Sequence, residues 1–120
     1  MCEEGGKLSG TLPEDPEGVA RLLSTLGLCA RARKLTFGIP MTCEAMKKGG
    51  SGAPVGVFEA ADTSENSHKR ISDRCRFYGV PLYRLPVDGE RLAAAVGKSA
   101  ALGAVGVTDK GLFGAVTGRK

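Results

Sequence analysis

The chain has 120 residues, of which 42% are hydrophobic, with a formal net charge of +4 and a pI of about 9.0. This length fits one domain and is short for two, and the hydrophobic content excludes a disordered chain. No apolar run approaches the roughly 18 residues that span a bilayer. The first residues also lack the basic and then apolar pattern of a signal peptide, so we expect a cytoplasmic protein without a membrane partner.

Helical and extended segments alternate along the chain after an opening stretch rich in Gly, Glu and Pro. We expect residues 1–14 to form a flexible tail and residues 15–120 to form a single domain. Capping residues, glycines and apolar spacing predict helices that begin near residues 15, 39, 62, 88 and 108. Short apolar runs predict strands over 35–37, 55–60, 81–85 and 103–107. This alternation indicates an α/β fold, a three-layer α/β/α sandwich around a central four-stranded mixed sheet.

Two of these segments carry more detailed expectations. The run 55–60 shows no clean alternation of apolar and polar residues, which is typical of a central strand covered on both faces. In the third helix, Ile71, Cys75 and Tyr78 lie at helical spacing and are expected to face the core.

Side chains that could carry catalysis or hold a metal are few. The four cysteines show no close spacing such as C-x-x-C, and His68 is the only histidine, so we expect reduced, buried thiols and no metal site. His68 precedes Ile71 by three residues, and a half-buried or surface position fits it better than a catalytic role. Phosphate-binding glycine motifs are absent as well. The sequence therefore favours a protein that is not an enzyme and has no cofactor.

Glu59 stands out because it lies in the apolar run 55–60. A buried carboxylate is unfavourable by several kcal/mol unless it is paired or protonated. We expect Glu59 to point to a sheet end or to meet a basic side chain, and a role in a functional site is the alternative.

Cationic residues gather in two places. One cluster contains Arg31, Arg33 and Lys34, with Lys47 and Lys48 nearby. The second cluster consists of His68, Lys69, Arg70, Arg74 and Arg76. Both clusters point to an anionic partner. The chain has no Trp and few other aromatics, which argues against an aromatic stacking platform for single strands.

The segment 34–48 joins a short strand to a helix through Gly38. A glycine lets the backbone approach a ligand closely, and the first N–H groups of a helix lack intrahelical partners. These N–H groups and the positive end of the helix dipole suit such a turn to an anion such as phosphate.

Five short strings add a family likeness: LGLCARARKL at 26–35, ADTSENS at 61–67, CRFYGVPL at 75–82, LAAAVGK at 92–98 and VGVTDKG at 105–111. Their order and spacing, from about residue 19 to residue 116, resemble the kink-turn-binding ribosomal protein superfamily of the L7Ae and L30e types, especially its small bacterial YlxQ-type members. The resemblance implies an α/β/α sandwich that binds RNA and is not an enzyme. Its implied partners are structured RNA, kink-turn-like or ribosomal, together with ribosomal or translation-related proteins.

The resemblance also implies an RNA face built from three segments: the Gly38 turn with the start of the second helix, the loop before the third helix, and the loop before the fourth. The residues expected there are Lys34, Thr36, Gly38, Ile39, Pro40, Met41, Glu44, Lys48, Ala61, Asp62, Leu85, Pro86 and Val87. Leu85 and Val87 are expected to cap flipped-out bases.

The Gly38 turn departs from the family pattern. RNA-binding members carry Gly-x-Asn-Glu, with a lysine three residues after the glutamate, and the matching residues here are Pro40, Met41 and Glu44. Met41 cannot accept a hydrogen bond from a guanine edge as a carboxylate does, and Pro40 has neither an N–H nor a side-chain amide. Glu44 is negative where the lysine would neutralise a phosphate. Because a lost base contact removes about 1–3 kcal/mol, we expect weakened or altered kink-turn specificity.

Two functions follow from these observations. The leading one is a small, non-enzymatic RNA-binding protein, ribosome-associated or translation-linked, with an altered RNA-reading turn. The alternative is a protein-interaction module that keeps the fold and has lost specific RNA binding. In that case Ile39, Pro40 and Met41 would form an exposed patch for a protein partner.

Overall fold

The computed structural model describes residues 16–117, so the tail expected over 1–14 lies outside the described residues. The elements follow one another as α1 (Pro16–Arg31), β1 (Leu35–Phe37), α2 (Ile39–Lys48), η1 (Gly50–Gly52, a 3₁₀ turn), β2 (Gly56–Glu59), α3 (Glu65–Tyr78), β3 (Leu82–Arg84), α4 (Gly89–Ala95), β4 (Ala104–Val107) and α5 (Lys110–Thr117). Within the described part, none of the helices has the length and apolar character needed to cross a membrane.

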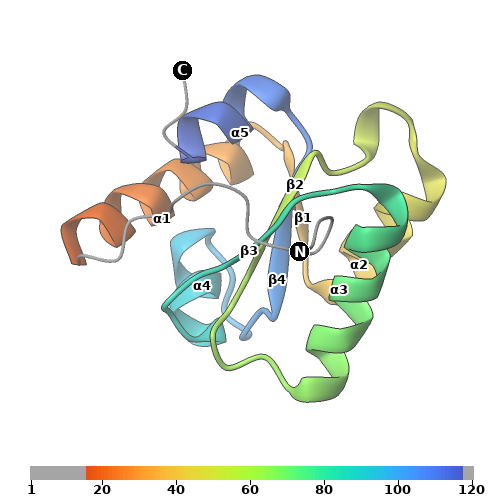
Figure 1. Ribbon diagram of the computed structural model, residues 1–120. Helices are drawn as coiled ribbons and strands as arrows, with labels where there is room; N and C mark the ends of the chain where they lie inside the picture. The colour runs from red at the N-terminus through yellow and green to blue at the C-terminus, as the bar shows by residue number, and fades with distance from the viewer. Residues whose placement is uncertain (1–15, 118–120) are drawn as a thin grey trace.

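The sheet is mixed, and helices cover both of its faces (Figure 1). The strand order is β1-β4-β2-β3, in which β4 runs antiparallel to both of its neighbours while β2 and β3 are parallel. Helices α1, α4 and α5 lie on one face, and α2 and α3 lie on the other. This arrangement confirms the predicted α/β/α sandwich with its four-stranded mixed sheet.

Two apolar clusters, one on each face of the sheet, hold the layers together. In β2, Phe58 joins Leu26 and Leu92 in one cluster, whereas Val57 joins Ile71 in the other. Every residue of β2 and of β4 is buried, which confirms the predicted central strand within 55–60. Burying a side chain of this size contributes about 1.5–3 kcal/mol, so β2 helps to hold both helical layers to the sheet.

Three of the four cysteines lie among the described residues, and all three agree with the expectation of buried, reduced thiols. Cys29, Cys43 and Cys75 are buried and form no disulfide. Burial raises the pKa of each of these thiols above its ordinary value, because the thiolate would lose its hydration.

The end of α3 corrects one prediction. Tyr78 is 36% exposed and does not face the core. Gly79 takes the left-handed conformation, and the next residue, Val80, donates its N–H to the carbonyl of Cys75 over 2.8 Å. Because the chain reverses at Gly79, the side chain of Val80 is buried and takes the core position that was expected for Tyr78.

Candidate functional site

A hollow of about 380 Å³ opens at one edge of the sheet. Because β4 is antiparallel to β1 and β2, its first residues lie beside the last residues of those two strands. Loops that are far apart in the sequence therefore meet at this edge. The residues around the hollow are Gly38, Ile39, Pro40, Asp62, Thr63, Ser64, Ser67, Gly89, Ala101, Leu102 and Gly103.

The Gly38 turn forms one wall of the hollow. Its backbone has a φ of 86°, which a glycine adopts without strain and other residues rarely do. The Gly38 N–H donates to the carbonyl of Ala104 over 2.8 Å, and the Gly38 carbonyl accepts from the N–H of Thr42 over 3.1 Å. No side chain in the described part of the chain caps the start of α2, and Pro40 contributes no N–H to its first turn. The start of α2 is thus open to a ligand that accepts hydrogen bonds.

Two further helices begin at the same hollow. Ser64 caps α3 by accepting a hydrogen bond from the N–H of Ser67 over 3.2 Å. Thr63 ties this helix start to the beginning of β4, because its hydroxyl lies 3.1 Å from the carbonyl of Gly103. At the start of α4, the N–H of Gly89 donates to the Asp62 carboxylate over 2.9 Å. The positive ends of three helix dipoles therefore converge on one opening.

The two loops expected at the RNA face, 61–62 and 85–87, are joined to each other. The Ala61 N–H donates to the Val87 carbonyl over 2.7 Å, and the Arg84 side chain donates to the Ala61 carbonyl over 2.8 Å. Asp62 links this pair to α4. Among the described residues that line the hollow, Asp62 is the only charged one, so no lysine or arginine of the described part faces the positive helix ends there.

Four of the predicted site residues have buried side chains. They are Thr36, Ile39, Leu85 and Val87, each less than 9% exposed. Leu85 and Val87 point into the core because extended backbone alternates its side chains between two faces, and the exposed residues there are Arg84 and Pro86. The expectation that Leu85 and Val87 cap flipped-out bases is therefore wrong for this structure.

The side chains of Thr36 and Ile39 are also buried and cannot contact a ligand directly. The Thr36 hydroxyl lies 2.8 Å from that of Thr42 and accepts the Gly106 N–H over 3.1 Å. Ile39 packs in the core under α2, so the exposed apolar patch expected at this turn consists of Pro40 and Met41 alone. The Met41 side chain is 51% exposed, although its sulfur lies 3.4 Å from the N–H of Phe37.

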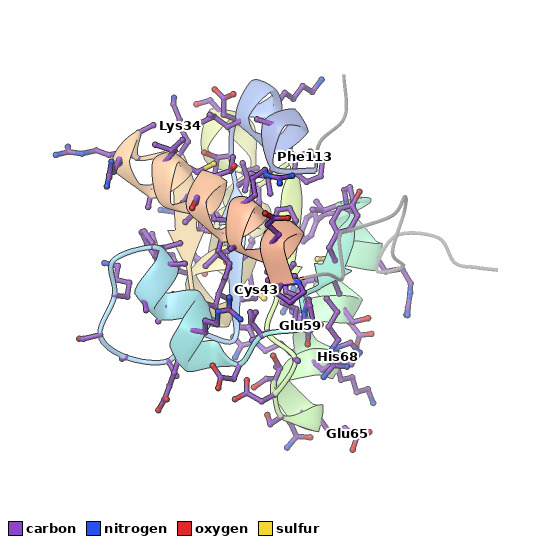
Figure 2. All side chains as sticks on the ribbon, turned by 90° about the vertical axis from the view of Figure 1, so that its left-hand side faces the viewer. Lys34, Cys43, Glu59, Glu65, His68 and Phe113 are labelled. Atoms are coloured by element: carbon purple, nitrogen blue, oxygen red, sulfur yellow. The ribbon has the colours of Figure 1, made fainter. Side chains whose placement is uncertain are left out.

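Lys34 and Lys48 are exposed but lie away from the hollow. Lys34 precedes β1 at the end opposite Gly38, and Figure 2 shows it at the other end of the molecule from Glu65, the first residue of α3. Lys48 ends α2, which is about 15 Å long at 1.5 Å per residue. Only Gly38, Pro40, Met41, Glu44, Ala61, Asp62 and Pro86 remain as predicted site residues that are both near this edge and at least partly exposed.

Sequence reasoning missed the loop between α4 and β4. Ala101, Leu102 and Gly103 line the hollow, and Leu102 is tied to α4 by its N–H, which donates to the Gly89 carbonyl over 3.1 Å. An added Cβ at Gly103 would lie 2.9 Å from the end of the Ile39 side chain, so this loop passes close to the start of α2. The direction of β4 is the signal that would have placed this loop beside Gly38.

Glu59 at the end of β2 and His68 on α3 form a pair (Figure 2). The Glu59 side chain is fully buried, and its two carboxylate oxygens lie 2.7 and 2.9 Å from Nδ1 of His68, whose side chain is 40% exposed. This confirms the expectation that Glu59 meets a basic side chain and that His68 is half-buried. Residues 16–117 contain no group of three or more His, Cys, Asp or Glu that could hold a metal ion.

Comparisons with known proteins agree with this geometry. Residues 20–116 match the model of the ribosomal protein L7Ae/L30e/S12e/Gadd45 family. The RNA-binding protein YlxQ of Bacillus subtilis (strain 168) is 33% identical over 86 residues, which are 72% of this chain and 81% of YlxQ.

Two solved structures share the fold. A protein of unknown function from Bacillus halodurans superposes with a TM-score of 0.73 at 29% identity, over 82% of this chain and 95% of that one. The 15.5 kD RNA-binding protein of Giardia lamblia superposes with a TM-score of 0.65 at 18% identity, over 89% of this chain and 88% of that one. At that level of identity the second likeness shows the fold alone.

Proposed function

The chain belongs to the ribosomal protein L7Ae/L30e/S12e/Gadd45 family, and on that premise we propose that it is a small RNA-binding protein that works in translation or on the ribosome. The observation that carries the proposal is the hollow at which α2, α3 and α4 all begin. A bent RNA offers phosphates and splayed nucleotides to such a site, and helix N-termini bind phosphate without the help of side-chain charge.

We propose that RNA enters against Gly38 and the α4–β4 loop. Gly38 has no side chain, and Ala101 and Gly103 are small, so a sugar–phosphate backbone can come close to the protein backbone there. Exposed Pro40, Met41 and Glu44 take the place of the groups that read bases in the family pattern. We therefore propose that shape and backbone contacts contribute more to this binding than base recognition, with reduced kink-turn specificity.

The test is a fluorescence titration of the protein with a kink-turn RNA and with a straight duplex of scrambled sequence. Ala101→Glu places a carboxylate in the hollow and is expected to lower RNA affinity at least tenfold, because it repels phosphate at the contact. Ser24→Glu makes the same change on the exposed side of α1 and should leave affinity unchanged. Absence of binding to either RNA at micromolar concentration and low salt would contradict the proposal.

A second candidate function is a protein-interaction module, and two observations favour it. No cation among residues 16–117 lines the hollow, and Pro40 and Met41 expose apolar atoms beside it. A protein partner would suit such a surface better than an RNA that needs charge neutralisation. Pull-down from native lysate decides between the two: partners that survive RNase treatment and are lost with Met41→Asp support the module, whereas purely RNase-sensitive capture excludes it.

A further inference from the structure

The outward face of α3 carries an aromatic and arginine cluster that the hollow does not use. Phe77 is 78% exposed, and its ring lies 4.8 Å, centroid to centroid, from that of Tyr78 in an edge-on arrangement. A second hollow, of about 370 Å³, is lined by Arg70, Asp73, Arg74 and Phe77. Aromatic residues and arginines are the residue types that are enriched at binding surfaces, and here they lie side by side.

The charges around Phe77 are mainly positive. Between residues 69 and 78 there are four cationic side chains and one acidic one, Asp73, which is paired with Arg76 over 3.6 Å. Both Arg70 and Arg74 are exposed, and they lie near enough to Cys43 of α2 for their positive charges to oppose the rise in its pKa that burial causes. Arg70 and Arg74 thus flank a cavity with an exposed ring at its end.

This chemistry fits an unpaired RNA strand. Arginine forks bind phosphate oxygens in two-point contacts, and exposed aromatic rings stack on bases of any sequence. A protein partner fits less well, because the apolar part of the surface is limited to two rings among charged residues, whereas stable interfaces have a broad apolar centre. This differs from the composition-based expectation of no stacking platform, since Phe77 and Tyr78, which are neighbours in the sequence, both have exposed rings near the end of α3.

The two hollows lie along the same helix. Ser64 and Ser67 at the start of α3 line the first, and Phe77 near its end lines the second. The ten residues from Ser67 to Phe77 span about 15 Å, which is the length of about four or five stacked nucleotides. We propose that Arg70, Arg74 and Phe77 form a second RNA contact that holds an unpaired extension of the RNA bound at the hollow beside Gly38. This inference rests on the proposed RNA-binding function, which gives the RNA its path to α3, but the residues of the second contact are different ones.

The experiment compares three RNAs in fluorescence titrations: a kink-turn stem, the same stem with an unpaired extension of about eight nucleotides at one end or the other, and the free extension alone. The extension at one of the two ends is expected to raise affinity about tenfold over that of the bare stem, which is the contribution of about one stacked base. Phe77→Ala and Arg74→Gln should each remove that gain and leave the affinity for the bare stem unchanged. Leu28→Ala, which truncates another exposed apolar side chain on α1, should affect none of the three RNAs.

The outcomes separate this inference from the proposed function. If the stem is not bound at all but the free extension is, and Phe77→Ala abolishes that binding, the α3 contact stands and the proposed function fails. If neither extension raises affinity, or if Phe77→Ala weakens the bare stem equally, the α3 contact is wrong. Pull-down from native lysate adds a further outcome. If both α3 variants bind RNA as the natural chain does but no longer capture an acidic protein that survives RNase treatment, the α3 surface is a protein site and the RNA contact is wrong.

Discussion

At the scale of single residues, the Glu59–His68 pair sets a local requirement for stability. The carboxylate is fully buried and His68 is the side chain that reaches both of its oxygens. Removing His68 leaves a buried acceptor without this partner, which is more unfavourable than losing the contact itself. We expect His68→Ala to lower the free energy of unfolding by about 2–3 kcal/mol at neutral pH, measured by urea denaturation.

A double-mutant cycle tests the same point. Glu59→Gln combined with His68→Ala should be more stable than the sum of the single changes, because the neutral amide has less hydration to lose. Lys69→Ala, at the neighbouring exposed position of α3, serves as the control with little effect. Strict additivity of the two changes would show that the pair contributes no coupling.

The thiol of Cys75 predicts a loss of stability in alkali. Burial, with smaller contributions from Cys43 and Glu59, raises its pKa from 9.0 to about 12. Above pH 9 the unfolded chain releases this proton while the folded chain keeps it, so the stabilising contribution is complete below pH 9 and falls as the pH rises toward 12. The destabilisation caused by Cys75→Ala should shrink by about 2 kcal/mol between pH 8.5 and 10.5. Val80→Ala, which removes no titratable group, should show a pH-independent effect in the same denaturation series.

Glu44 predicts a gain of RNA binding. It is exposed on α2 and places a negative charge near the edge where RNA is proposed to bind. Glu44→Lys reverses that charge and should raise kink-turn affinity about tenfold at low salt, since it removes one repulsion and adds one phosphate contact. Glu17→Lys makes the same change on α1. Equal gains in both variants would show that only net charge matters.

The sequence was sufficient for the residues whose roles depend on local chemistry. Gly38 was placed at a turn by its position between a strand and a helix, and Glu59 was expected to be paired because an unpaired buried charge is so unfavourable. The side-chain directions of Leu85 and Val87 were missed, although the alternation Arg84, Leu85, Pro86, Val87 carries that signal. Lys34 and Lys48 were grouped with Gly38 by closeness in sequence, which does not measure distance in the fold.

At the scale of elements, a close contact between β2 and α5 makes a sharp prediction. An added Cβ at Gly56 would overlap the ring of Phe113, which also lies 5.9 Å from Phe58 and 6.0 Å from Tyr83 by ring centroids. Gly56→Ala must therefore displace the Phe113 ring, and we expect it to lower the free energy of unfolding by about 1–3 kcal/mol.

Matched variants isolate the cause of that loss. Gly52→Ala adds the same methyl where nothing lies within 4 Å, so thermal unfolding should change little. Phe113→Leu makes room beside Gly56, so the alanine should be less destabilising in that background than in the natural chain. An equal loss in both backgrounds would mean that backbone freedom at Gly56, and not the ring, is responsible.

The elements themselves were predictable, and their relative directions were not. Caps and apolar spacing mark the helix starts to within three residues, because these signals are local. Strand order depends on which apolar faces pack best across the whole chain, and no short segment contains that information. The antiparallel direction of β4 brings Ala101, Leu102 and Gly103 to the hollow. This loop was not predicted as part of the site because the strand directions were not predicted.

At the scale of the whole molecule, the charges lie apart from the hollow. Cations gather at residues 31–34, at the end of α2 and along α3, whereas the charged residue that lines the hollow is Asp62. In the proposed mode, an RNA bound only at the hollow would release few counterions, because helix N–H groups and not cationic side chains would face its phosphates. An RNA that continues along α3 meets arginines and releases more.

Salt dependence therefore reports the path of the RNA. For a single strand the logarithm of the binding constant falls by about 0.7 per neutralised phosphate for each unit in the logarithm of salt concentration. The extended RNA should show a slope steeper than the bare stem by about 1.4, the value for two arginines. Arg70→Gln with Arg74→Gln should reduce the slope of the extended RNA to that of the stem. Arg21→Gln with Lys110→Gln removes two exposed cations from α1 and α5, on the opposite face of the sheet, and should leave both slopes unchanged. If this second pair flattens the slope as much as the first, the RNA responds to net charge and follows no defined path along α3.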